Sequence, residues 1–404
     1  MHKILIACVS VLFLLFFGCV QPVGQGDDVY GAVAVGGGDD GLVTDLERAV
    51  LLDEEGFAPG AKPVETFEYN ITEISRIRPP TVNGHPVQAN DIVISGNTAY
   101  VAYNTAGPVF DGAVQIIRIN GRKLRFEREI AFASMDVITL NLQGDKLYFG
   151  GMADPDVFDG RRSFIGVIDL YNPKARNIAD SLVWLNSFAA TGIAVYSDEF
   201  FVSVGAADGG VEILGQDMVP LAASPAIEAD DIRDIEEYSG GVIALAGTTD
   251  SVAENGRILI IKNGVVTREI TIEDFDSPEA KATLEVNGGY AYLGLSAKGF
   301  QVCDLSNENV LLTFPNPDAD PLHVTNSVSF EDDLIFSANG EYGFRVLRYV
   351  PADASAVIVG YYGFQGLTDG YGQNYSANHV EYRNKYLFVA SGAGGLSAYQ
   401  LSVK

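Results

Sequence analysis

A pattern of about 48 residues recurs seven times along the chain and constrains its fold more than any other feature. Each copy has an apolar strand, a polar turn, a second strand rich in aromatic and small residues, a Gly/Asp loop and a third strand. The first and second strands of the copies fall at 91–104, 137–151, 192–205, 232–247, 282–296, 325–339 and 377–391. Repeats of about 40–50 residues that contain several short strands are typical of propeller blades.

Further apolar segments supply a fourth strand to most copies. These candidates are residues 123–132, 178–185, 264–272, 310–314 and 356–364. The seventh copy has no such segment, because the chain ends at Lys404 directly after its third strand. Residues 64–74 alternate like a strand and precede the first copy, so we expect them to complete the last blade and leave no open edge. The prediction is an all-β fold: a seven-bladed β-propeller of four-stranded antiparallel blades, closed by the strand at about 64–74.

Two copies resemble the LVIVD repeats, a bacterial propeller family whose core reads V-x-G-x-x-A-Y-V-A followed by G-L-x-I-x-D. The matching residues are 93–102 in the first copy, and 286–293 with 299–304 in the fifth. The third, fourth and sixth copies match poorly. The resemblance covers about residues 90–404 and implies an exported or surface propeller. It brings no catalytic motif with it, and a fold by itself does not define a function.

The charge of the chain excludes some classes of partner. It holds 53 Asp and Glu against 26 Lys and Arg, which gives a formal charge of -27. Such a surface repels nucleic-acid phosphates and anionic lipid headgroups and favours cations or a basic partner. Apolar residues make up 47% of the chain, which is enough for a large core.

The N-terminal residues are typical of an export signal. Residues 1–18 contain a basic start and the apolar run 4–17, and Gly18-Cys19 resembles the end of a bacterial lipobox, although Phe16 departs from the usual Leu. We therefore expect lipidation at Cys19, a flexible tether over 19–63 with one short helix at 43–52, and the β-propeller over 64–404. The expected location is the bacterial cell envelope, at the outer membrane or cell surface. An uncleaved anchor or an ordinary signal peptide is the alternative.

Polar residues lie near the start of the first strand in most copies. In a propeller these strands line a central channel, so we expect their polar groups to share one face, where a cation or a sugar could bind. The members of this ring are Asn90, Asp91, Asp136, Thr191, Asp231, Arg233, Thr283, Asn326 and His379. The alternative is a channel filled only with water, because converging strand ends always leave polar groups.

Two further groups of side chains are weaker candidates for binding. Asp154, Asp156 and Asp159 are spaced like oxygen ligands of Ca²⁺ but lack the rest of an EF-hand loop, so solvated turn carboxylates are the alternative. Aromatic residues crowd 361–375 and suit sugar or peptide contact, unless they pack at a strand end. The sequence has no other sign of a cofactor, and no signature of a known catalytic site occurs in it.

The sequence favours a non-enzymatic binding or protein-interaction module that is held to the membrane only through its N-terminal lipid. The expected partner is an envelope protein, a peptide or a glycan on the propeller face, and the expected state is a monomer. The alternative is a hydrolase or lyase that acts on polysaccharide at the channel mouth. In that case Asp136, Asp231 or His379 would be essential to the activity.

Overall fold

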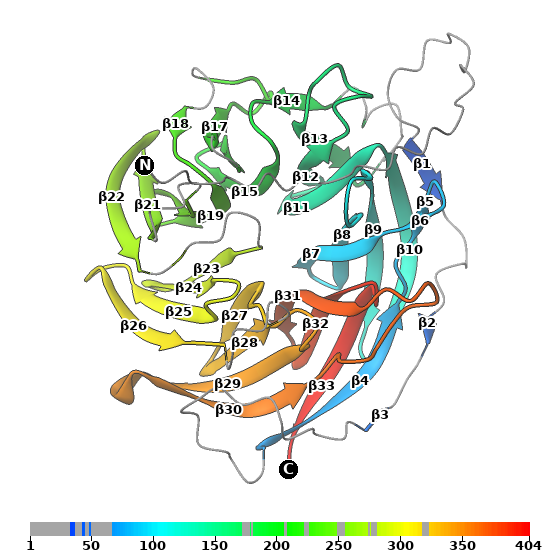
Figure 1. The fold of residues 1–404 in the computed structure, drawn as a ribbon, viewed down its shortest axis with the longest axis vertical. Helices are drawn as coiled ribbons and strands as arrows, with labels where there is room; N and C mark the ends of the chain where they lie inside the picture. Colours follow the sequence, from blue (N-terminus) through cyan, green and yellow to red (C-terminus); the bar gives the residue numbers. More distant parts are fainter. Residues whose placement is uncertain are drawn as a thin grey trace, which may run out of the picture.

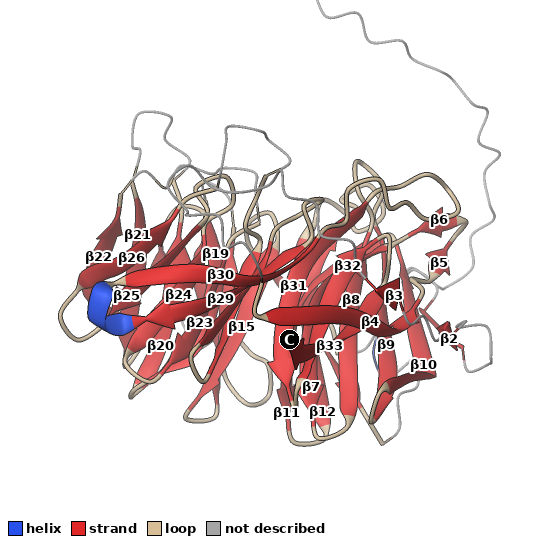
Figure 2. Cartoon of the chain, turned by 90° about the horizontal axis from the view of Figure 1, so that it is seen from below, coloured by secondary structure: helices blue, strands red, loops and turns tan. Residues whose placement is uncertain are grey.

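Antiparallel sheets stand side by side around a common centre in this computed structural model (Figure 1). The structure describes residues 67–171, 178, 181–205, 208–221, 226–248, 255–273, 275, 281–316 and 323–404, and the backbone of three short strands before them. Each sheet begins with a strand at the centre and steps outward along the chain. In Figure 2 the strands run between two layers of loops.

Five of the sheets have four strands each, paired in chain order. The strands of the first two are β11 (Met135–Gln143), β12 (Lys146–Ala153), β13 (Ser163–Asp169), β14 (Val183–Leu185), β15 (Ala190–Tyr196), β16 (Glu199–Val204), β17 (Gly210–Leu214) and β18 (Ile227–Glu228). Those of the next two are β19 (Ile232–Tyr238), β20 (Gly241–Ala246), β21 (Gly256–Lys262), β22 (Val265–Ile272), β23 (Thr283–Asn287), β24 (Tyr290–Gly294), β25 (Phe300–Asp304) and β26 (Asn309–Phe314). The fifth has β27 (Ser327–Glu331), β28 (Leu334–Ala338), β29 (Phe344–Val350) and β30 (Ser355–Tyr362).

Eight further strands form two more such groups, which a single residue pair, Gly392 with Ala89, joins into one larger sheet. One group is β7 (Gln88–Ser95), β8 (Thr98–Asn104), β9 (Asp111–Asn120) and β10 (Lys123–Ala133). The other is β31 (Tyr375–Arg383), β32 (Tyr386–Gly392), β33 (Leu396–Val403) and β4 (Tyr69–Ile77). The segment expected to complete the last copy therefore lies beside β33, although its strand begins at Tyr69 rather than near residue 64.

Most expected outer strands are present, with two differences. Residues 178–185 form a strand only at Val183–Leu185, and Ile178 is helical. The third copy has the two-residue strand β18, although no fourth-strand candidate was expected there. A small hairpin of β5 (Thr81–Val82) and β6 (His85–Pro86) and the 3₁₀ turn η1 (Pro351–Asp353) complete the described elements of 67–404.

The core consists of apolar layers between neighbouring sheets. In one layer Tyr100 and Val114 of one sheet lie in the same apolar cluster as Phe149 and Phe164 of the next. Side chains that alternate along each strand thus bury both faces of the sheet, which explains why these strands read as apolar runs.

A glycine before the third strand fixes the sharp turn into it in three successive sheets. Gly299, Gly343 and Gly395 have φ of +89°, +82° and +76°. A Cβ atom on any of them would lie 2.0–2.1 Å from a carbonyl oxygen of the adjacent outer strand. Only glycine fits both demands, which gives a physical reason for the Gly of the G-L-x-I-x-D pattern.

Strand β4 is anchored by buried polar contacts as well as by its ladder with β33. The guanidinium of Arg76 donates to Glu73 over 2.7 Å, and the hydroxyl of Tyr362 donates to the same carboxylate over 3.1 Å. Arg76 also lies over the ring of Tyr375, 4.5 Å from its centroid. Both charged side chains are almost fully buried, so their mutual pairing is needed to offset their loss of hydration.

The N-terminal part of the chain is described only at three short strands. Strand β1 (Val33–Gly36) pairs with β10, while β2 (Val43–Thr44) and β3 (Arg48–Ala49) pair with β4. The helix expected at 43–52 was wrong, because two strands form there against the open edge of β4. The expected signal peptide and Cys19 lie outside the described residues, as does most of the expected tether. Among the described residues, no helix is long and apolar enough to cross a membrane.

Candidate functional site

The first strands of all these groups surround one cavity of about 1350 Å³, here called the central cavity. Its wall contains residues of β7, β11, β15, β19, β23, β27 and β31. Because each first strand starts on one face and ends in a hairpin on the other, the cavity has two ends. We call them the entry end, where these strands begin, and the hairpin end, where they turn into the second strands.

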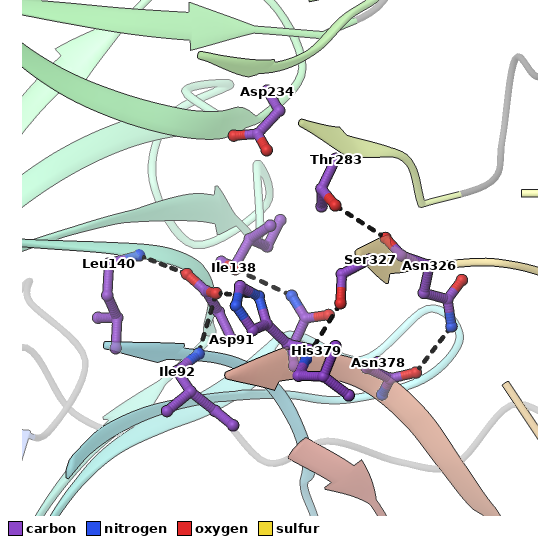
Figure 3. A network of polar contacts seen from close by, with 12 residues as sticks. Asp91, Ile92, Ile138, Leu140, Asp234, Thr283, Asn326, Ser327, Asn378 and His379 are labelled. Atoms are coloured by element: carbon purple, nitrogen blue, oxygen red, sulfur yellow. Dashed lines mark hydrogen bonds and ion pairs between the residues drawn. The ribbon is translucent and has the colours of Figure 1, made fainter. Parts of the chain in front are cut away.

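Most polar groups at the entry end link one sheet to the next. The amide of Asn90 donates to Ile138 O over 2.9 Å, and the hydroxyl of Thr191 donates to Ile232 O over 2.8 Å. Thr283 and Asn326 donate in the same way to the following first strand (Figure 3). These predicted site residues thus satisfy backbone carbonyls that converging strands leave without a ladder partner.

Asp91 connects its own sheet to both neighbouring sheets. Its carboxylate accepts hydrogen bonds from the backbone N–H of Ile92 and of Leu140 in the next sheet, each 2.9 Å long. The Nδ1 atom of His379 lies 2.8 Å from the same carboxylate (Figure 3). Burial opposes its ionisation, but His379, Lys281 and the backbone donors outweigh burial and hold the pKa of Asp91 below its ordinary value.

Asp234 repeats the geometry of Asp91 in another sheet. It accepts from the N–H groups of Ile235 and of Leu284 in the next sheet, each over 2.9 Å. Both aspartates directly follow a register shift in the first ladder of their sheet. Burial raises the pKa of Asp234 to about 7.

Lys281 spans the central cavity at the entry end. It precedes β23, yet its ammonium group donates to the backbone O of Asn90 and, over 3.1 Å, to the Oδ1 of the same residue on β7. Burial lowers the pKa of Lys281, while the charges of Asp91 and Asp234 act against that effect. The chain therefore places a primary ammonium group of its own among the carbonyl and carboxylate oxygens of the cavity.

Two other predicted residues form an ion pair, and two are placed differently from the prediction. Arg233 donates to Asp231 over 2.6 Å, and both line the cavity. Asp136 and Asn326 do not line it. Asp136 is 1% exposed, accepts from the N–H and hydroxyl of Thr105, and has a pKa that burial raises to about 7. Its place in the predicted ring was wrong because it holds the loop after β8 instead.

Carboxylates that the sequence analysis did not single out collect toward the hairpin end. They are Glu236 of β19, Glu285 of β23 and Glu381 of β31. Burial raises the pKa of Glu285 to about 7 and that of Glu381 to about 8. Glu236 is exposed to the solvent that reaches the cavity, and partial loss of hydration there, together with the charges of Asp234 and Glu285, raises its pKa above the ordinary value. Glu285 accepts from Phe330 N–H over 3.1 Å, and Arg383 lies 4.0 Å from Glu381.

A signal for these groups exists in the sequence. The second half of the first strand reads Asp-Ile-Glu at 234–236, Leu-Glu-Val at 284–286 and Val-Glu-Tyr at 380–382. A carboxylate thus recurs at this depth of the repeat in three copies. Lys281 carries no such signal, because its partner lies 191 positions away in the chain.

The weaker candidates stay outside the central cavity. Asp154 accepts from the backbone N–H of Asp156 over 2.9 Å and so stabilises its own turn. No group of three or more His, Cys, Asp or Glu side chains suited to a metal ion is found in the described part of the chain. Within 361–375, Tyr362 and Phe364 are buried against Phe344, and Tyr371 is 69% exposed.

Comparison with known proteins supports the fold and one family. The LVIVD repeat model matches residues 87–107 and 282–311, which contain the cores of the first and fifth copies. No curated protein matches the sequence.

Three solved structures are similar in fold. The WD40 repeats of RRP9 superpose with a TM-score of 0.57 at 11% identity, covering 80% of this chain and 97% of that one. U3-55K gives 0.56 at 11% identity, with 80% and 98% covered. The WD40 β-propeller domain of Doa1 gives 0.53 at 12% identity, with 80% and 96% covered. At such identities the likeness concerns the fold alone. The chain is an all-β protein of the β-propeller fold that carries LVIVD repeats.

Proposed function

We propose that the chain is a seven-bladed β-propeller, closed through β4, which acts as a lipid-anchored binding module of the bacterial cell envelope. The five separate sheets and the two groups joined at Gly392 and Ala89 correspond to the seven copies in the sequence. The pairing of β4 with β33 supports closure. Lipidation at Cys19 and the envelope location rest on the sequence of residues 1–19.

One observation carries the proposed binding role: a cavity of about 1350 Å³ runs through the centre of the sheets and is lined by many charged groups. Small-molecule sites are usually concave and of roughly 300–1,000 Å³, with a few placed polar groups. The cavity is large enough for a small ligand or an extended segment of a peptide. We therefore assign binding to the central cavity and expect no turnover.

Calorimetry with the protein that starts at Cys19 tests this role. Envelope glycans and peptides are titrated into the protein, and mass spectrometry follows the same mixtures for cleavage products. We expect binding of one of these classes, weakened at least tenfold by Glu236→Arg, which places a cation inside the cavity. Binding that Glu236→Arg leaves unchanged would contradict the assignment of the site.

Anchoring is tested separately by Cys19→Ala in a bacterial host. We expect the wild-type chain in the membrane fraction with the mass of a lipid on its N-terminal peptide, and the variant without either. Membrane retention of the variant would show that Cys19 is not the anchor.

A propeller hydrolase or lyase acting on polysaccharide is the second candidate. The specific observation in its favour is the pair of His379 and Asp91, 2.8 Å apart at the cavity wall. A carboxylate that orients an imidazole is a usual arrangement for a general base. Cleavage of an envelope polysaccharide that His379→Ala abolishes, with folding retained, would replace the binding role by this one.

A further inference from the structure

The hairpin of β9 and β10 concentrates positive charge in an otherwise acidic chain. Residues 118–128, here called the basic hairpin, hold five of the 26 Lys and Arg residues and one of the 53 Asp and Glu residues, which gives a local charge of +4. The whole chain has a formal charge of -27. The molecule as a whole therefore repels anionic surfaces, whereas this hairpin attracts them.

The charged side chains of the basic hairpin face the solvent. Arg118, Lys123 and Arg125 are exposed on the two strands, and Arg122 is exposed in the turn between them. Arg118 forms an ion pair with Glu127 over 2.9 Å. The positive charge in excess of this pair therefore stands on the turn and on β10.

The turn of the basic hairpin lies on the same layer of loops as the hairpin end of the central cavity. Thr98, which starts β8 at that end, pairs with Arg118 near the end of β9. A second pair of exposed basic residues, Arg161 and Arg162, lies on the opposite layer, in the loop after β12. That loop, 154–162, also carries three Asp residues and has a local charge of -1. The two pairs thus differ in the charge that surrounds them.

The chain that leads from Cys19 joins the body at the sheet of the basic hairpin. Strand β1 pairs with the outer edge of β10, with Val33 opposite Phe132 (Figure 1). Phe132 lies nine residues along β10 from Lys123, which corresponds to about 30 Å. Thirteen residues separate Cys19 from Val33 and can span at most about 50 Å. A lipid on Cys19 therefore permits contact between the basic hairpin and the membrane that holds the lipid.

Salt screening decides between the charge of the hairpin and the charge of the whole molecule. At physiological ionic strength the Debye length is about 8 Å, so acidic side chains on distant sheets contribute little to a contact that this hairpin makes. Each Lys or Arg held at an anionic lipid surface strengthens binding about fivefold. A few such residues do not anchor a protein alone, but they orient one that a lipid already holds.

We propose that the basic hairpin binds the anionic lipid headgroups of the membrane that carries the Cys19 lipid. The inference rests on the proposed lipid anchoring and adds a second membrane contact to it, contrary to the expectation from the overall charge. Binding there turns the loop layer of the hairpin end toward the membrane. The entry end of the central cavity, on the other layer, then stays accessible to partners.

Vesicle flotation of the unlipidated chain that starts at Cys19 tests the hairpin without the anchor. Vesicles of phosphatidylcholine are compared with vesicles that contain about one third phosphatidylglycerol. At low salt we expect binding to the anionic vesicles that is at least tenfold weaker on the neutral vesicles and in Arg122→Glu/Lys123→Glu. The control Arg161→Glu/Arg162→Glu makes the same change of net charge on the opposite layer and should bind like the wild type.

Attachment through residue 19 tests the orientation. The chain that starts at Cys19 has one further cysteine, the buried Cys303, so a maleimide lipid couples at Cys19. A photoreactive group on the phosphatidylglycerol headgroup then labels the loops at the membrane, and mass spectrometry locates the label. We expect at least five times more label on 118–128 than on 154–162, and no such preference in Arg122→Glu/Lys123→Glu.

Four results would overturn the proposal. They are no binding to anionic vesicles at low salt, binding that both double variants lose equally, binding that neither loses, and a dimer that Arg122→Glu/Lys123→Glu separates without any vesicle binding. The last would assign the hairpin to a second copy of the chain. Failure of the anchoring itself is distinguishable, because it shows in Cys19→Ala in the host and leaves flotation of the unlipidated chain unaffected. The thermal midpoint of each variant verifies that it is folded.

Discussion

The two ends of the central cavity are built from the same strands but use their polar side chains differently. At the entry end Asn90, Asp91 and Thr191 bond to the first strand of the next sheet. At the hairpin end Glu236, Glu285 and Glu381 line the cavity with raised pKa values. The difference indicates that polar groups at the entry end hold the sheets together, while ionised carboxylates at the hairpin end are unfavourable for stability. Groups that stabilise and groups that destabilise the fold thus occupy opposite ends of one cavity.

Asp91→Ala should produce the largest effect. It leaves the N–H groups of Ile92 and Leu140 without their acceptor and His379 without the neighbouring carboxylate, and unsatisfied buried donors cost about 1–3 kcal/mol each, so we expect a loss of about 2–4 kcal/mol. Denaturant unfolding at pH 7 measures this loss in the free energy of unfolding. Glu236→Ala at the hairpin end is the control and should change it by less than about 1 kcal/mol. Equal losses in the two variants would remove the distinction between the ends.

Glu381→Gln should act in the opposite direction. The carboxyl has a pKa of about 8 in the folded chain, against about 4.3 in an unfolded one. Between these values only the folded chain holds the proton, so stability falls as the pH rises through that interval. The variant lacks this fall and should be more stable by about 1–2 kcal/mol at pH 8.5, since water in the cavity screens part of the cost. At pH 4.5 the two proteins should be alike.

Thermal unfolding between pH 4.5 and pH 8.5 measures this difference. Midpoints of wild type and variant that run parallel over the whole interval would show that folding does not raise the pKa of Glu381. The surface variant Glu228→Gln should follow the wild type throughout.

Thr191→Val should give the smallest effect. It removes the hydroxyl that donates to Ile232 O over 2.8 Å and keeps the shape of the side chain, which costs about 1 kcal/mol. Thr283→Val removes a longer contact of 3.3 Å and should cost less. Chemical unfolding of both variants ranks them, and the reverse order would argue against these links as the source of stability at the entry end.

The sheets were predictable because alternation and apolar runs mark each strand of the repeat. Two outer strands are exceptions. Strand β18 has only two residues, too few to show alternation, and β14 is shorter than the apolar segment that contains it. The ring of polar residues followed from the convergence of first strands. Asp136 does not line the cavity because its carboxylate accepts a hydrogen bond from the backbone N–H of Thr105. Nothing in the sequence indicates that contact.

The acidic hairpin end was harder to foresee than the entry end. Glu285 and Glu381 stand in strands whose neighbours are apolar, so they read as solvent-facing positions of half-buried strands. Their convergence depends on how far each strand runs along the axis of the cavity. Lys281 precedes β23 in the chain, and only the assembled sheets bring it to Asn90.

The pairing of β4 with β33 has a consequence for the order in which the sheets fold. Ile77 pairs with Leu396, so one edge of a strand that emerges early has no partner until β33 has been made. Contacts of such long sequence separation slow folding, and until they form they leave an unpaired strand edge that is prone to aggregation. We therefore expect the sheet that contains β4 and β33 to form after the other sheets, whose strands are neighbours in the chain.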